Sequence, residues 1–272
     1  MSEIADHIQT LTDMTGRTVL VTGASSGLGM RFATVLASSG AKVALAARRL
    51  DRLEVVVAQI KANGGHAIAL ATDVTDESSV VAAYDVAEAT LGPIHTVIAN
   101  AGINAQGLAT NLTVEDFDRI MAVNVRGAFL TAREGARRMV AAGSRDGQWA
   151  RIVLISSIGA HSILPGLAAY CASKAAVTMM GRCLARECSS PVVASTINLP
   201  RSEMGSQVGP KCSSCVRCMM GGFELRAGPF LRSAWDQTLS RILTPPSAAS
   251  SRSLAASSWL VAAALSKFGW NL

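Results

Sequence analysis

The sequence is poor in charged and aromatic residues, and it has no long apolar run. Of its 272 residues, 16% are charged and 4% are aromatic, while half are hydrophobic. This balance excludes an intrinsically disordered chain and is typical of a globular domain with a sizeable core. A late apolar stretch, residues 259–265, is far too short to span a membrane, so we expect no membrane partner. The first sixteen residues lack the apolar segment of a signal peptide, so we expect a cytoplasmic protein.

The sequence also has few cysteines, and its excess of positive charge is confined mostly to the last part of the chain. Six cysteines in a chain of this size are more typical of free thiols than of a disulfide framework. The formal net charge is +6, but residues 205–272 hold seven Lys or Arg against two Asp or Glu, which leaves the first 204 residues nearly neutral. Because no basic helix or aromatic-interleaved stripe occurs, we expect no nucleic-acid partner.

Short apolar runs alternate with longer helical patterns up to about residue 200. The pattern predicts strands over 17–23, 41–47, 66–74, 94–102, 151–157 and 192–200, and helices over 29–40, 50–65, 76–92, 113–143 and 168–187. Such alternation implies right-handed βαβ units and a parallel sheet, and continuously apolar strands indicate burial on both faces. We therefore predict a single α/β domain with a doubly wound parallel sheet, the Rossmann fold, over 16–204. Residues 1–15 would be an N-terminal extension and 205–272 a divergent tail.

A glycine-rich stretch, VTGASSGLG over 21–29, joins the first predicted strand to the first predicted helix. Gly23, Gly27 and Gly29 would let the backbone approach a pyrophosphate, and the helix N-terminus would supply N–H groups and a positive dipole. An ordinary glycine-rich turn is the alternative. The strand–turn–helix context favours a dinucleotide site.

Two arginines follow the second predicted strand, where this fold reads the adenosine ribose. An arginine at this point accommodates a 2′-phosphate, so Arg48 and Arg49 favour NADP over NAD. Asp51 is the competing acid, and we interpret it as the cap of the following helix. A solvated basic turn is the alternative reading of the arginines.

A tyrosine and a lysine lie four residues apart in AAYCASK, residues 168–174. On a helix, Tyr170 and Lys174 would share one face, one turn apart. A phenol beside an ammonium group is a candidate proton donor, although such a pair alone is more often a solvated helix face. The reduction of a carbonyl needs a hydride on carbon and a proton on oxygen, and such a phenol would supply the proton.

Taken in order, these motifs resemble the classical short-chain dehydrogenase/reductase family over about residues 15–187. The matching elements are the glycine motif Thr22–Gly29, Asp73-Val74, Asn100-Ala101-Gly102, Asn124, Ser157 and the Tyr170/Lys174 pair. Ser157 precedes Tyr170 by thirteen residues, the usual interval in the family, which favours it over Ser156.

The resemblance implies a catalytic set. Tyr170 would be the general acid or base. Lys174 and the oxidised nicotinamide would favour the phenolate and so move the pKa of Tyr170 toward working pH, and Lys174 would also hold the nicotinamide ribose. Ser157 would hydrogen-bond the substrate oxygen, and Asn124 would position a water that links Lys174 to solvent. The implied cofactor-binding residues are Gly23, Ser25, Ser26, Gly27, Leu28, Gly29, Arg48, Asp73, Val74, Asn100, Ala101, Gly102, Tyr170, Lys174 and Pro200.

The family implies an NADP(H)-dependent oxidoreductase that interconverts a ketone and a secondary alcohol. By general resemblance we expect a 3-oxoacyl or similar small carbonyl substrate. We also expect a homodimer or homotetramer built through the helices over 113–143 and 168–187. The alternative is a nucleotide-binding protein with little or no catalysis.

That alternative arises because the family pattern fails near the C-terminus. Arg201 follows Pro200 where the family has glycine, and Ser202 stands where threonine is usual. Residues 205–272 lack the family's closing elements, which suggests a divergent or frame-shifted tail. The tail also holds cysteines with the spacing C-x2-C-x2-C, at positions 212, 215 and 218. We expect these to be unligated thiols and predict no metal, with a metal site as the alternative.

Overall fold

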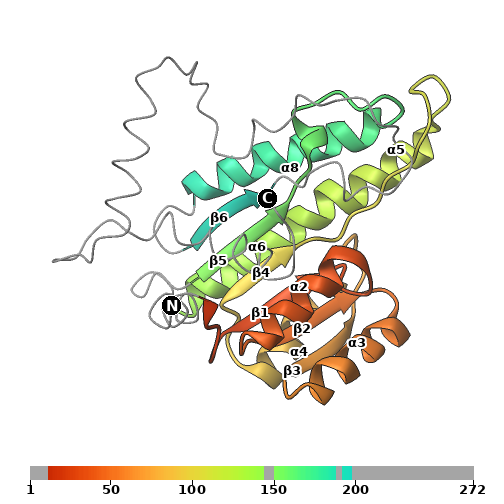
Figure 1. The fold of residues 1–272 in the computed structure, drawn as a ribbon. Helices are drawn as coiled ribbons and strands as arrows, with labels where there is room; N and C mark the ends of the chain where they lie inside the picture. The colour runs from red at the N-terminus through yellow and green to blue at the C-terminus, as the bar shows by residue number, and fades with distance from the viewer. Residues whose placement is uncertain (1–11, 144–149, 188–191, 198–272) are drawn as a thin grey trace, which may run out of the picture. The chain divides into compact units, whose positions relative to one another are not determined.

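Six parallel strands form the sheet at the centre of the described part of the chain. The computed structural model describes residues 12–143 and 150–187, and the backbone of 192–197. The strands are β1 (Thr18–Thr22), β2 (Lys42–Ala47), β3 (His66–Ala71), β4 (Thr96–Ala99), β5 (Ala150–Ile155) and β6 (Val192–Ile197). Their order is β3-β2-β1-β4-β5-β6, so the chain winds outward in both directions from β1 (Figure 1). The predicted doubly wound α/β fold is confirmed. Each predicted strand is present and has fewer residues than predicted, and β5 begins one residue earlier than expected.

Helices cover both faces of this sheet. They are α2 (Gly27–Ser38), α3 (Leu50–Ala62), α4 (Glu77–Leu91), α5 (Val114–Met121), α6 (Gly127–Ala141) and α8 (Ala168–Glu187). Helices α2 and α3 pack with Val19 and Val21 of β1 on one face, while α4, α6 and α8 pack with Leu20 on the other (Figure 1). Both faces are buried, which explains why the strands are apolar throughout. Within the described ranges, no helix combines the length and the apolarity needed to cross a membrane.

Two local predictions need correction. The single helix expected over 113–143 is interrupted by a π-helical turn, Ala122–Arg126, which separates α5 from α6. Asp51 is not a cap, because α3 begins at Leu50 with Arg49 at the N-cap position and no side-chain cap bond. The Asp51 carboxylate lies in the first turn instead, where it interacts favourably with the helix dipole.

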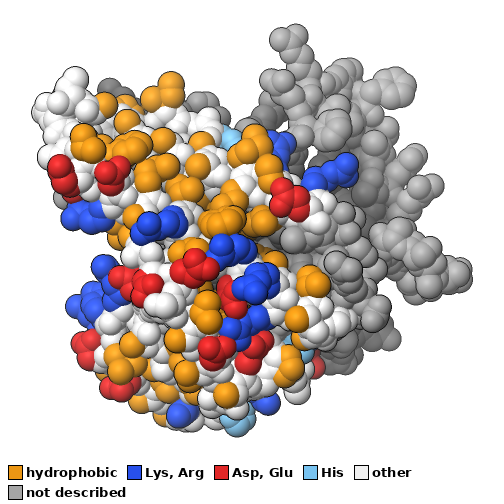
Figure 2. Space-filling model, turned by 180° about the vertical axis from the view of Figure 1, so that it is seen from behind, with side chains coloured by type: hydrophobic (Ala, Val, Ile, Leu, Met, Phe, Trp, Pro, Cys, Tyr) orange, Lys and Arg blue, Asp and Glu red, His pale blue; other side chains and the backbone are white. Residues whose placement is uncertain are grey.

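An ion cluster joins α4 to α6 on the face of the sheet opposite α2 and α3. The Arg138 guanidinium donates to carboxylates of Glu134, Glu88 and Asp85 at 2.7–2.8 Å, and it lies over the Tyr84 ring at 5.4 Å. Glu134 is buried, so its charge depends on this partner. Figure 2 shows acidic and basic side chains interleaved across this side of the molecule.

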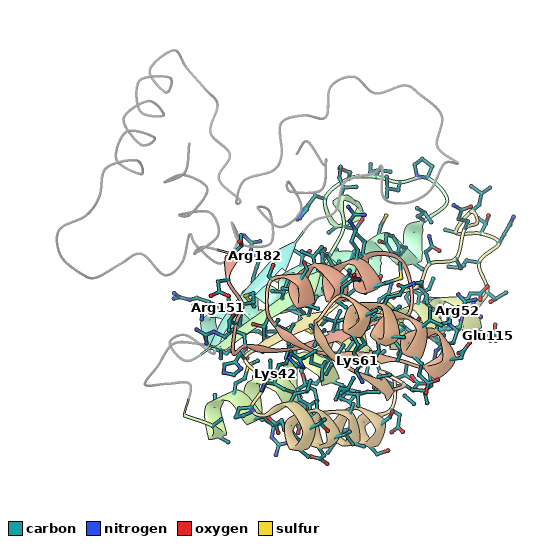
Figure 3. All side chains as sticks on the ribbon, turned by 60° about the horizontal axis from the view of Figure 1, so that its bottom comes forward. Lys42, Arg52, Lys61, Glu115, Arg151 and Arg182 are labelled. Atoms are coloured by element: carbon teal, nitrogen blue, oxygen red, sulfur yellow. The ribbon has the colours of Figure 1, made fainter. Side chains whose placement is uncertain are left out.

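A ring nitrogen of the half-buried His95 joins the amino ends of β1 and β4. The Thr18 backbone N–H donates to His95 Nδ1 at 3.0 Å, so this nitrogen must be unprotonated. Burial and then the charge of Arg17 lower the pKa of His95, Lys42 lowers it further, and a hydrogen bond with the Pro93 backbone opposes them. Figure 3 shows Lys42 and Arg151, which belong to this end of the sheet, on the opposite side of the view from Arg52 and Glu115.

The hydrogen bond from the Thr18 N–H to His95 predicts that the protein is less stable at acidic pH. The pKa of His95 is lowered in the folded chain. As the pH falls below about 6.5, the His95 side chain is therefore protonated in the unfolded chain before it is protonated in the folded chain. The free energy of unfolding should therefore decrease below that pH and be insensitive to this group above it.

Urea unfolding at pH 7.5 and 5.5 measures the effect. In His95→Asn, the amide oxygen can accept the same N–H without titrating, so the loss at pH 5.5 should be smaller than in the wild type. His66→Asn, at an exposed histidine, is the control and should keep the wild-type pH dependence. Equal pH dependence in wild type and His95→Asn would contradict the assignment.

Candidate active site

A cleft of about 480 Å³ lies at the carboxyl ends of the strands. Parallel strands end at one edge, so the loops after β1 to β5 and the start of α8 meet there. The cleft gathers most of the predicted cofactor residues: Gly23, Ser25, Ser26, Leu28, Arg48, Asp73, Val74, Asn100, Ala101, Gly102, Tyr170 and Lys174. Gly27 and Gly29 belong to the same turn at the start of α2 without lining the cleft. Pro200 lies outside the described residues.

The glycine-rich turn after β1 packs closely against the loop after β4. A Cβ on Gly29 would lie 2.4 Å from the Gly23 carbonyl oxygen and 2.5 Å from Asn100 Nδ2. That amide also donates to the Thr22 carbonyl at 3.0 Å, which fixes the two loops together. At Gly27, with φ of +56°, an added Cβ would meet nothing within 4 Å, so the start of α2 stays accessible. This packing leaves backbone N–H groups at a helix N-terminus open to a phosphate, as a dinucleotide requires.

Two arginines follow β2 at the edge of the cleft, and a carboxylate follows β3. Arg48 and Arg49 are exposed, and Arg49 donates to Ser25 Oγ at 3.1 Å. Asp73 accepts from the Thr75 backbone N–H and hydroxyl at 2.9 and 2.8 Å, and these bonds hold its pKa below the usual value. Arg48 and Arg49 both line the cleft, and Arg49 lies beside Ser25.

Asn124 sits in the π-helical turn, with only 1% of its surface exposed. Its amide oxygen accepts from the Ile103 N–H at 2.8 Å, and its amide nitrogen donates to the Ile103 carbonyl and Ser173 Oγ, both at 2.9 Å. The Ser173 hydroxyl donates to the Tyr170 carbonyl at 2.7 Å. One side chain thus fixes the loop after β4 relative to α8.

Lys174 is buried beneath this loop, with 5% of its surface exposed. Its ammonium donates to the Ile155 carbonyl at 2.8 Å and lies 5.7 Å from the centre of the Tyr170 ring. Burial lowers the pKa of Lys174 to about 8. The group therefore lies close to its titration point at neutral pH.

The structure brings Tyr170 together with Ser157. A hydrogen bond from Ser157 lowers the pKa of the phenol, but burial raises it more, and the neighbouring Cys171 adds to the rise. Lys174 is not among the causes of this shift, so the expectation that Lys174 and the oxidised nicotinamide together favour the phenolate stays a prediction. Ser156 has a different role, because its Oγ lies 3.1 Å from the Lys174 carbonyl and 2.7 Å from Thr178 Oγ1 and so packs β5 against α8.

The family model of the short chain dehydrogenases matches residues 17–201. The chain belongs to the short-chain dehydrogenase/reductase family. Members of this family are oxidoreductases that use NAD(P) and act on small molecules. The match therefore agrees with the resemblance drawn from the ordered motifs.

Three relatives illustrate the range within this family. Elsinochrome reductase 1 of Elsinoe fawcettii is 37% identical over 175 residues, which are 64% of this chain and 63% of that protein. The solved 3-ketoacyl-(acyl-carrier-protein) reductase of Brucella melitensis, complexed with NADH, is 33% identical with a TM-score of 0.65 and covers 69% of this chain and 76% of its own. A gluconate 5-dehydrogenase of Burkholderia cenocepacia, in complex with NADP and tartrate, is 27% identical with a TM-score of 0.65 and covers 70% and 74%. The chain thus spans less than two thirds of the length of the fungal reductase.

Sequence reasoning missed Ser173, which links Asn124 to the backbone of Tyr170. A signal was available, because Ser173 lies three residues after Tyr170 and so falls near it on a helix. Among the described residues, no cluster of three or more His, Cys, Asp or Glu could hold a metal ion. The three cysteines at 212, 215 and 218 lie outside the described residues.

The buried ammonium of Lys174 predicts a stability gain on substitution. Between pH 8 and 10.5 only the unfolded chain holds this proton, so burying the charged group is most unfavourable below pH 8. Lys174→Met should raise the free energy of unfolding at pH 7 by roughly 1–3 kcal/mol.

Thermal unfolding at pH 7 and pH 10 measures this gain, which should shrink at pH 10 because the wild-type amine is then largely neutral. Lys61→Met, at an exposed lysine on α3, is the matched control and should change little at either pH. A gain of equal size at both pH values would attribute the effect to apolar packing alone.

Proposed function

We propose that this chain is an NADP(H)-dependent oxidoreductase that interconverts a ketone and a secondary alcohol. The observation that supports this proposal most directly is the meeting of Ser157, Tyr170 and Lys174 at the carboxyl ends of the strands. The same cleft extends to the glycine-rich turn and to Arg48 and Arg49.

In this mechanism NADPH supplies the hydride that reaches the carbonyl carbon. Tyr170 gives its phenolic proton to the carbonyl oxygen, and the Ser157 hydroxyl donates a hydrogen bond to the same oxygen as charge develops on it. Lys174 holds the ribose hydroxyls of the nucleotide, and its position depends on the Ile155 carbonyl. Asn124 holds the Ile103 backbone and α8 in place, so the distance between the two sides of the cleft is fixed.

The raised pKa of Tyr170 has a directional consequence. A phenol whose pKa lies above its ordinary value of about 10 is protonated at neutral pH and is ready to act as an acid. Oxidation needs the phenolate, which the protein alone disfavours. At neutral pH the protein alone therefore holds Tyr170 in the protonation state that reduction requires.

The preference for NADP over NAD is supported by the arginines, while the two solved structures named above contain NADH in one case and NADP in the other. Arg49 already donates to Ser25, so a 2′-phosphate would find one serine hydroxyl and two guanidinium groups at the same place.

For the substrate we retain a 3-oxoacyl thioester or a similar small ketone, a class that the name of the Brucella melitensis neighbour includes. Assembly as a homodimer or homotetramer is supported by exposed apolar residues on the expected interface helices. These are Phe117 on α5, Phe129 on α6 and Met179 on α8, which are 39–57% exposed.

Turnover of NADPH over a panel of ketones and 3-oxoacyl thioesters tests the function. Tyr170→Phe removes the proton donor and should lower kcat by roughly 10²–10⁴-fold, with NADPH affinity nearly unchanged. Tyr84→Phe is the matched control, because Tyr84, the other tyrosine of the chain, donates to the Thr131 carbonyl between α4 and α6 and does not line the cleft.

Tyr84→Phe should keep its turnover per folded molecule. Turnover in Tyr170→Phe within threefold of the wild type would overturn the assigned role. NADPH binding without any wild-type turnover would favour the nucleotide-binding alternative.

The arginines predict the cofactor preference. Arg48→Ala and Arg49→Ala should each weaken NADPH binding by roughly 10–100-fold and leave NADH binding within a few-fold, because each removes a charged hydrogen bond to the 2′-phosphate only. Arg52→Ala, at an exposed arginine on α3, is the control. Equal weakening for both nucleotides in the Arg48 and Arg49 variants would refute the phosphate assignment.

A further inference from the structure

A buried glycine follows the active-site serine by two residues. Gly159 lies in the short 3-10 turn Ile158–Ala160, which leaves β5 toward the start of α8. Its backbone N–H donates to Ser157 Oγ at 3.1 Å, and both residues are buried. No motif in the sequence drew attention to this position.

There is almost no room for a side chain at Gly159. A Cβ there would lie 3.1 Å from Leu164 Cδ1, 3.2 Å from Cys171 Sγ and 3.6 Å from Ser157 Oγ. The first two distances are shorter than ordinary van der Waals contacts. The end of the Leu164 side chain can rotate away, whereas the backbone of Cys171 is held on α8 by the bond from its N–H to the Leu167 carbonyl at 2.8 Å, so its sulfur can give way only by a change of rotamer. An added methyl group would therefore push the turn, and with it the N–H that reaches Ser157.

The bond from Gly159 also decides which way the serine hydroxyl points. A hydroxyl has one proton and two lone pairs. Because the Gly159 N–H occupies one lone pair, the Ser157 proton is directed to another partner, and Ser157 is hydrogen-bonded to Tyr170. Hydrogen bonds in such a chain polarise one another, so the backbone N–H strengthens Ser157 as a donor.

We propose that Gly159 is a positioning residue for the oxidoreductase reaction, acting through Ser157, and that Cys171 sets how little space the position allows. This inference rests on the function proposed above. Gly159 orients the Ser157 hydroxyl so that its single proton is donated to the Tyr170 phenol in the free protein and to the substrate oxygen when substrate is bound. It touches neither the substrate nor the cofactor.

The first test is Gly159→Ala. Displacement of the Ser157 donor should lower kcat by roughly tenfold, less than the loss of a whole oxyanion donor, with the Kd for NADPH unchanged. In the oxidation direction, the pH at which activity appears should move upward, because the phenol loses a bond that lowers its pKa. Gly107→Ala is the matched control, since a Cβ at that position meets nothing within 4 Å.

Two double variants separate positioning from general damage. Gly159→Ala/Cys171→Ala removes the sulfur that a methyl group would meet, and it should recover most of the lost kcat. Gly159→Ala in a Ser157→Ala background should lower kcat no further, because the residue through which Gly159 acts is already gone. Additive losses in that background, or no recovery with Cys171→Ala, would overturn the proposal.

A further measurement does not depend on turnover. The ionisation of the two tyrosines can be followed by NMR of protein with labelled tyrosine rings. Gly159→Ala should raise the pKa of Tyr170 and leave the Tyr84 signal unchanged. An unchanged Tyr170 pKa would refute the positioning role, whereas a raised pKa in a chain without turnover would support it and count against the proposed function alone.

Discussion

The geometry of the site depends on the side-chain amide of Asn124. Its oxygen and nitrogen both bond to the Ile103 backbone, and its nitrogen also reaches Ser173, which bonds the Tyr170 carbonyl. The Asn124 amide can bond to the loop and to α8 at the same time only if the backbone at Asn124 places the side chain between them. The π-helical turn provides that placement, and such turns occur frequently at functional sites. Farther along the same loop, the Gly107 N–H donates to the Gly166 carbonyl at 3.0 Å, which ties the loop to the segment before α8 as well.

The site is thus built from polar groups that are buried and satisfied. Lys174 and Ser157 would each destabilise the fold if left without partners, and each has one: the Ile155 carbonyl for the first, the Gly159 N–H for the second. Even so, the ammonium is held where burial opposes its charge. The apolar packing on both faces of the sheet stabilises the fold, as does the Arg138 cluster between α4 and α6. Together they offset the free-energy cost of burying the Lys174 ammonium.

The sequence was sufficient for the sheet, because continuous apolar runs and glycine-marked turns are local signals. The sequence was also sufficient to predict that the motif residues lie together, because they follow strand ends or share one helix face at the same edge of the sheet. It failed where an answer depends on tertiary burial. The π-helical turn at Asn124 adds one residue to a helix whose apolar pattern then resumes, so periodicity cannot reveal it. The pKa of Tyr170 depends on how deeply α8 packs, and Asp51 was misplaced because helix starts vary by a residue or two.

The order of the sheet has a consequence for how the chain is made. At the centre, β1 pairs with β4, and the bonded residues Thr18 and His95 are 77 positions apart. A nascent chain that has released only β1, β2 and β3 already carries the glycine-rich turn and both arginines, but it lacks the strand that completes the other wall of the cleft. Closing so long a loop is slow, as is usual for parallel pairing. During synthesis, affinity for the cofactor therefore arises late. A bound nucleotide stabilises the domain only after the chain has been synthesised as far as α8.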